Sequence, residues 1–228
     1  MCIRDSKCFV NICYHCKQDS ALIKADHLLG FDEIPLQNSD PRNQDAVQLL
    51  GRPAGDGLIT IRETDRMLVL SCEQFTYVFN KLTGLFDKMT FANEPLLDQP
   101  MGFNVWRAPT DNDRKLKADW YAAHYDHAAT NAYHTEYTVT ASGVTLHTHV
   151  GIAAICVQKF LDLDVTWTVA NNGSVDLALH AQRNTVFPEL PRFGLRLFLP
   201  QEMSQVNYYG MGPMECYCDK HHAASHNS

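Results

Sequence analysis

Long apolar runs are missing from this 228-residue sequence, and so is any excess of basic residues. No segment approaches the ~20 consecutive apolar residues that a membrane-spanning helix needs, so no membrane partner is expected. The formal net charge is −7, from 19 Lys and Arg against 26 Asp and Glu, and no basic stripe offsets the acids. This balance argues against a nucleic-acid partner as well.

An export signal is also missing, because the start of the sequence (residues 1–5) lacks an apolar core segment. We therefore expect a cytoplasmic protein whose eight cysteines are reduced thiols. The segment from Cys13 to Cys16 is half of a zinc-type pattern, but the second half is missing. Incidental cysteines are the favoured interpretation, and no metal site is predicted in this chain.

Short strand-like segments dominate what is present, and hydrophobic residues make up 45% of the sequence, as in globular proteins. The clearest strand pattern covers residues 160–169, where polar residues alternate with Leu161, Leu163, Val165, Trp167 and Val169. Only residues 117–127 resemble a helix. Many short strands with almost no helix predict an all-β, antiparallel sandwich.

The best candidate for a domain boundary is the polar segment 38–57, which is rich in glycine and proline. It predicts a linker between a small N-terminal part, residues 1–37, and a larger β domain, residues 58–228.

The segment from Phe103 to Asp113 combines two large aromatics, an arginine, a rigid proline and an Asp-Asn-Asp run. Pro109 fixes its own φ, and Asx side chains can fold back on the backbone to hold a turn. One interpretation is a core tryptophan beside a capped turn. The other is a carbohydrate site, because sugars stack their C–H faces on aromatic rings and hydrogen-bond to acids and amides.

The run Phe103-Asn104-Val105-Trp106-Arg107-Ala108-Pro109-Thr110-Asp111-Asn112-Asp113 closely resembles the motif that opens the C-terminal β-sandwich domain of bacterial β-galactosidases, in glycoside hydrolase family two. Further segments resemble the same family in the same order: residues 27–33, 75–84, 119–121, 190–196 and 209–215. The resemblance implies a galactose-mutarotase-like β-supersandwich over residues 58–228, incomplete at its C-terminus. It also implies that residues 1–37 are the end of an immunoglobulin-like domain.

For function, the resemblance implies part of an enzyme that hydrolyses terminal β-D-galactosides such as lactose with retention. Its two catalytic glutamates belong to a (β/α)₈ barrel of ~250 residues, and no such alternation of strands and helices occurs in this sequence. We therefore expect no catalytic residue in this chain and no activity of the chain alone.

Substrate-binding residues are expected at the rim of the sugar site: Trp106, Arg107, Asp111, Asn112, Asp113 and Glu215. A purely structural role for these polar residues is an equally open interpretation, with Arg107 paired to Asp111 or Asp113. Glu215 stands before Cys216-Tyr217, where the family has Asn-Tyr, and a role in bracing its own loop is favoured there.

The resemblance also implies partners and ions. The expected partners are a β-galactoside and the barrel-bearing remainder of the enzyme, in the same or a separate chain, assembled as a homo-oligomer. Magnesium and sodium are implied for the full enzyme, with ligands outside this chain. Two alternatives stay open: a stand-alone carbohydrate-binding β-sandwich module, and the small chain of a two-chain β-galactosidase.

Overall fold

A computed structural model of the chain describes residues 9–36, 57–206 and the single positions 211, 212, 214, 216, 222, 224 and 225. The described residues belong to two compact units. One contains the segment 9–36 together with the residues from 205 on, and the other contains residues 57–204. Nearly all of the predicted linker, residues 38–57, lies outside the described residues, so the domain limits stay a prediction.

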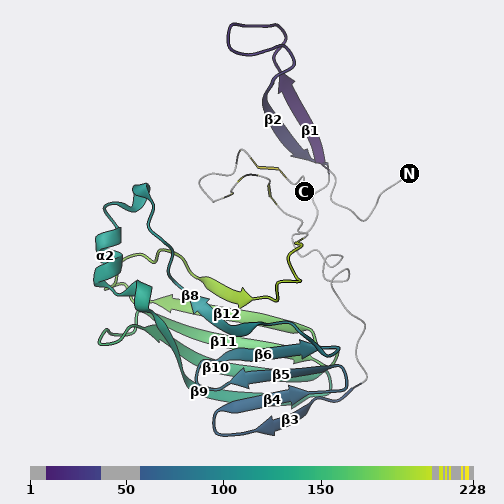
Figure 1. Ribbon diagram of the computed structural model, residues 1–228, viewed down its shortest axis with the longest axis vertical. Coiled ribbons are helices and arrows are strands. Elements are labelled where there is room, and N and C mark those ends of the chain that lie inside the picture. The colour runs from purple at the N-terminus through teal and green to yellow at the C-terminus, as the bar shows by residue number, and fades with distance from the viewer. Residues whose placement is uncertain are drawn as a thin grey trace. The chain divides into compact units, whose positions relative to one another are not determined.

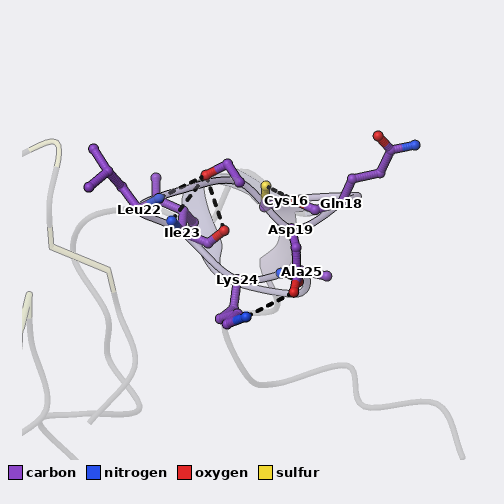
Figure 2. Close-up of polar contacts among 8 residues, drawn as sticks. Cys16, Gln18, Asp19, Leu22, Ile23, Lys24 and Ala25 are labelled. Atoms are coloured by element: carbon purple, nitrogen blue, oxygen red, sulfur yellow. Dashed lines mark hydrogen bonds and ion pairs between the residues drawn. The ribbon is translucent and has the colours of Figure 1, made fainter.

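The first unit contains an antiparallel hairpin of β1 (Phe9–His15) and β2 (Leu28–Pro35) (Figure 1). Polar contacts within its connecting loop hold the loop closed (Figure 2). The Asp19 carboxylate accepts hydrogen bonds from the backbone N–H of Ala25 at 2.8 Å and from Nζ of Lys24 at 2.9 Å. These bonds lower the pKa of Asp19, the Ala25 N–H contributing most. The Ser20 hydroxyl accepts a further bond, from the backbone N–H of Ile23, at 3.0 Å.

The second unit is built from antiparallel sheets, two of which lie one over the other (Figure 1). One sheet is a sequential meander of five strands: β3 (Thr60–Glu63), β4 (Met67–Ser71), β5 (Phe75–Asn80), β6 (Leu85–Phe91) and β7 (Glu94–Pro95). The other has the order β12-β11-β10-β9 and consists of β9 (Ala129–Thr140), β10 (Gly143–Ala153), β11 (Leu161–Ala170) and β12 (Val175–Arg183). A two-stranded sheet pairs β8 (Gln99–Asn104) with β13 (Gly194–Phe198). The predicted all-β antiparallel sandwich is confirmed.

The core lies between the two larger sheets, where the alternation predicted for β11 is realised. The five apolar side chains of this pattern are at most 3% exposed: Leu161, Leu163, Val165, Trp167 and Val169. The Trp167 ring meets Phe86 of the facing sheet edge-on, with ring centroids 5.2 Å apart. Its indole N–H donates to the Gly84 carbonyl at 3.0 Å, so the same side chain ties β11 to the β5–β6 turn.

Two features differ from the sequence-based expectations. The helix expected over 117–127 is broken into α2 (Lys117–Ala122) and the 3₁₀ turn η2 (Tyr125–His127), because His124 adopts a left-handed backbone with φ of 56°. The strands β9 and β10 were not individually predicted, although they are the longest of the described strands, at 12 and 11 residues. Within the described part of the chain, no helix is long and apolar enough to cross a membrane.

Candidate functional site

The predicted site begins where β8 ends. Asn104 closes the strand by bonding to the backbone of Trp106 twice: its amide donates to the Trp106 carbonyl at 3.0 Å and its oxygen accepts from the Trp106 N–H at 3.3 Å. This Asx-type bracket fixes the backbone from which the Trp106 side chain emerges. The indole is only partly buried and packs against Tyr121 of α2, with ring centroids 5.2 Å apart and an interplanar angle of 58°.

Arg107 and Asp113 close the loop that follows. Two guanidinium N–H groups donate to the two Asp113 carboxylate oxygens, at 2.5 and 2.9 Å. Thr110 adds a backbone N–H at 2.7 Å and its hydroxyl at 3.0 Å, both to the same carboxylate. The Arg107 guanidinium and then the Thr110 N–H hold the pKa of Asp113 well below its usual range, so the carboxylate is ionised at neutral pH. Of the two partners considered for Arg107, the structure selects Asp113.

A strap of residues 187–191 holds this loop from the other side. Pro188 and Pro191 have no N–H to donate, and the carbonyls of the strap accept hydrogen bonds from side chains. Five side-chain hydrogen bonds reach them: Trp120 Nε1 to Glu189 O at 2.9 Å, Tyr125 OH to Pro188 O at 2.7 Å, Arg107 Nε to Pro191 O at 3.1 Å, and Arg183 Nη1 to Phe187 O at 2.8 Å and to Pro188 O at 3.4 Å.

The strap therefore joins three of the segments that carry the resemblance: residues 103–113, 119–121 and 190–196. Arg107 links the first to the third through Pro191, and its guanidinium carbon lies 5.1 Å above the Trp120 ring. Trp120 is 3% exposed and Tyr125 is fully buried. Sequence reasoning missed the roles of these two side chains, because their acceptors are backbone atoms 69 and 63 residues away.

The six predicted site residues end in different environments. Asp111 and Asn112 lie on the exposed side of the 3₁₀ turn η1 (Asp111–Asp113), and no hydrogen bond to another described residue is recorded for either side chain. Asp113 is 6% exposed and faces inward. Trp106 and Arg107 are partly buried. Glu215 lies outside the described residues.

A second polar surface, away from this loop, covers the outer face of the β9–β12 sheet. A groove of about 310 Å³ is lined there by His134, Glu136, His147, Thr148, His149, Asp164, Val165 and Thr166. Its two carboxylates are on β9 and β11, with β10 between them, so their backbones are two strand spacings, roughly 9–10 Å, apart. Both carboxylates already have a histidine partner: an Asp164 oxygen lies 3.1 Å from Nδ1 of His149, and a Glu136 oxygen lies 3.6 Å from Nε2 of His134. We therefore assign no catalytic pair to this groove.

In the segments that the structure describes, no group of three or more His, Cys, Asp and Glu side chains is arranged to hold a metal ion. The described residues therefore offer no such cluster for the magnesium and sodium that the resemblance implies for the full enzyme. Five of the eight cysteines are described, and all five are free thiols: Cys13, Cys16, Cys72, Cys156 and Cys216.

Comparison with known proteins identifies the family of this chain. The family model of the β-galactosidase small chain matches residues 71–228. The chain belongs to this family. The match includes the loop from Trp106 to Asp113 and the whole strap, so the geometry described above lies inside the family's own region.

Individual β-galactosidases are also similar to this chain. A β-galactosidase of Actinobacillus pleuropneumoniae is 32% identical over 216 residues, which cover 95% of this chain and 21% of the relative. A β-galactosidase of Staphylococcus xylosus is 32% identical over 208 residues, covering 91% of this chain and 20% of the relative. A β-galactosidase of Pseudoalteromonas haloplanktis is 26% identical over 225 residues, covering 90% of this chain and 21% of the relative. The chain thus spans about a fifth of the length of these relatives, and the resemblance seen in the sequence is confirmed.

Proposed function

We propose that this chain is a non-catalytic part of a β-galactosidase, one that hydrolyses terminal β-D-galactosides such as lactose with retention. In this proposal the loop from Trp106 to Asp113 forms part of the rim of the sugar site and binds carbohydrate. The observation that carries it is the two-sided character of this loop. Arg107 and Asp113 lock its inner side, while Asp111 and Asn112 are exposed beside a partly exposed indole.

The division of roles follows from these contacts. Trp106 supplies an aromatic surface for a sugar C–H face, and the Asp111 and Asn112 side chains offer acceptors and donors to hydroxyl groups. Arg107 and Asp113 are already paired with each other, and Asp113 also accepts from Thr110, so in this proposal they act at the site mainly by holding their neighbours in place. Glu215 is a further candidate for sugar contact, from the second family motif.

The catalytic glutamates are assigned to a barrel outside this sequence. Support comes from the chain's share of its relatives, about a fifth of their length, and from the absence of barrel-like alternation in the sequence. The partners proposed for the chain are this remainder and a β-galactoside, in a cytoplasmic homo-oligomer. The implied magnesium and sodium would be bound by the remainder.

A two-chain arrangement is the second candidate. The matched family is described as a small chain, which supports a separate polypeptide that pairs with a barrel-bearing large chain. Both candidates share the same chemistry at the loop. They differ only in whether the barrel is covalently attached.

Complementation tests the proposal. The 228-residue chain is mixed with the Actinobacillus pleuropneumoniae β-galactosidase from which the matching fifth has been deleted, and hydrolysis of o-nitrophenyl β-D-galactoside is followed. We expect no turnover by either part alone and turnover by the mixture. Changing both Asp111→Ala and Asn112→Ala should raise KM of the mixture, while Asp176→Ala, an exposed acid on β12, should leave KM unchanged. Turnover by the isolated chain, or an inactive mixture, would overturn the proposal.

A further inference from the structure

Tyr121 is an exposed aromatic side chain on a rigidly held turn of helix. Its neighbour Trp120 points inward, is 3% exposed and donates its indole N–H to the strap at Glu189. Successive helical residues are about 100° apart, so the anchoring of Trp120 carries Tyr121 outward. The Tyr121 side chain is 49% exposed and lies against Trp106.

The hydroxyl of Tyr121 sets it apart from most other tyrosines of the chain. Six of the nine tyrosines are described, and the hydroxyls of four of them donate hydrogen bonds within the protein: Tyr14, Tyr77, Tyr125 and Tyr137. Within the described residues, Tyr121 and Tyr133 have no such bond recorded. The half-exposed ring and the hydroxyl of Tyr121 are thus both accessible to a ligand.

The surroundings of Tyr121 suit a sugar ring. Trp106 and Tyr121 are in contact, with their ring planes inclined at 58°, and the η1 turn that follows Trp106 in the chain has exposed Asp111 and Asn112 side chains. A galactoside has an apolar patch of ring C–H groups on the face opposite its axial hydroxyl, and its remaining groups are hydrogen-bond donors and acceptors. Such a ligand pairs with an aromatic platform edged by a carboxylate and an amide.

We propose that Tyr121 contacts the substrate and that it forms, with Trp106, the platform on which the galactosyl ring or the adjoining sugar of a β-galactoside stacks. The inference rests on the proposed function and extends the predicted site by a residue on a different element. The site is thus formed by the loop after β8 and by α2, which the strap holds together through Arg107 and Trp120.

Tryptophan fluorescence gives a direct test on the 228-residue chain. Of its three tryptophans, Trp120 and Trp167 are 3% and 2% exposed, so a ligand-induced change reports mainly on Trp106. Titration with methyl β-D-galactopyranoside should give a saturable change, and sorbitol, an acyclic polyol without a ring face, should not. Removing one stacking ring in Tyr121→Ala should weaken binding about two- to tenfold, since aromatic contacts contribute about 0.5–1.5 kcal/mol.

Two matched variants make the test specific. Tyr121→Phe keeps the ring and should retain most of the binding, while Tyr133→Ala removes a tyrosine that is 58% exposed on the β-sheet and should bind as the parent does. Far-UV circular dichroism checks that each variant is folded. Absence of a saturable change in the parent, or equal binding by Tyr121→Ala, would overturn the platform.

Failure of the platform is distinguishable from failure of the proposed function. In the complementation assay, a Tyr121→Ala chain that restores hydrolysis with the parent's KM means that the chain belongs to the enzyme and Tyr121 does not touch substrate. A parent chain that restores nothing rejects the proposed function itself. A raised KM with a restored kcat supports both proposals.

Discussion

Arg107 and Asp113, six residues apart, form a two-armed ion pair that folds the intervening loop back on itself. The Arg107 side chain is 29% exposed and the Asp113 side chain 8%, so water screens the pair only in part. The same carboxylate also accepts two bonds from Thr110. The hydrogen bonds from Arg107 and then from Thr110, with a smaller contribution from the charge of Arg107, favour the ionised form, which is why the pKa of Asp113 is lowered in the folded protein.

Acid should therefore destabilise this loop. The unfolded pKa of an aspartate is about 3.9, and the folded pKa of Asp113 is lower. Because the folded state holds this proton less tightly, the stabilisation is fully present above about pH 4 and is lost as the pH falls toward the folded pKa. Asp113→Asn should lower Tm at neutral pH and flatten its decline between about pH 4 and pH 2. Asp111→Asn changes an exposed side chain of the same turn. In thermal melts it should alter neither the Tm at neutral pH nor the decline of Tm in acid.

The strap depends on side-chain donors, and Tyr125 offers the cleanest test of them. Burial raises the pKa of Tyr125, so its hydroxyl stays protonated and donates to Pro188 O at 2.7 Å. Tyr125→Phe should lower the free energy of unfolding by about 0.5–1.5 kcal/mol, the usual net contribution of a hydrogen bond. Tyr133→Phe, which removes an exposed hydroxyl, is the matched control and should change it by less than about 0.5 kcal/mol. Equal urea midpoints for the two variants would contradict this account.

The contrast between β11 and β9 explains how far the sequence predicts this fold. In β11 every second residue is a large apolar side chain, and all five are buried. In β9 the sequence is mostly Thr, Asn, His, Glu and Ala, and most of its side chains are exposed, so no period-two pattern marks it. The strand exists because its backbone pairs with β10 over residues 129–140, an interaction that local sequence does not encode.

The candidate site, like the fold, is predicted by the sequence only in part. The turn at η1 and the pairing of Arg107 with a carboxylate within the motif follow from local chemistry, since residues six positions apart must lie near each other in a tight loop. The choice of Asp113 depends on loop closure, because only this side chain points inward to Thr110 and Arg107. The strap contacts of Trp120 and Tyr125 join residues more than 60 positions apart, and no periodicity or propensity could indicate them.

The turn between β5 and β6 should tolerate only glycine at its tip. Gly84 has a φ of +73°, and an added Cβ would lie 2.8 Å from side-chain carbons of both Thr148 and Val150 on the facing sheet. In Gly84→Ala, the left-handed backbone of a non-glycine residue costs about 1–2 kcal/mol, and the added methyl group also clashes inside the sandwich. We expect a loss of at least about 1 kcal/mol in the free energy of unfolding. Gly102→Ala, where an added Cβ meets nothing within 4 Å, should be neutral in the same urea titration, and a comparable loss there would contradict this assignment.

The last prediction compares the central strand β11 of the β9–β12 sheet with its edge strand β12. Leu163 on β11 is 0% exposed against the facing sheet, whereas Leu177 on the edge strand β12 is 37% exposed. Leu163→Ala should lower the free energy of unfolding by about 2–5 kcal/mol, because it removes buried apolar surface and leaves a cavity. The chemically identical change Leu177→Ala removes surface that is already partly hydrated, and we expect a loss below about 1 kcal/mol. Chemical denaturation of both variants measures the difference. Comparable losses at the two positions would mean that another part of the protein covers the β12 edge in solution.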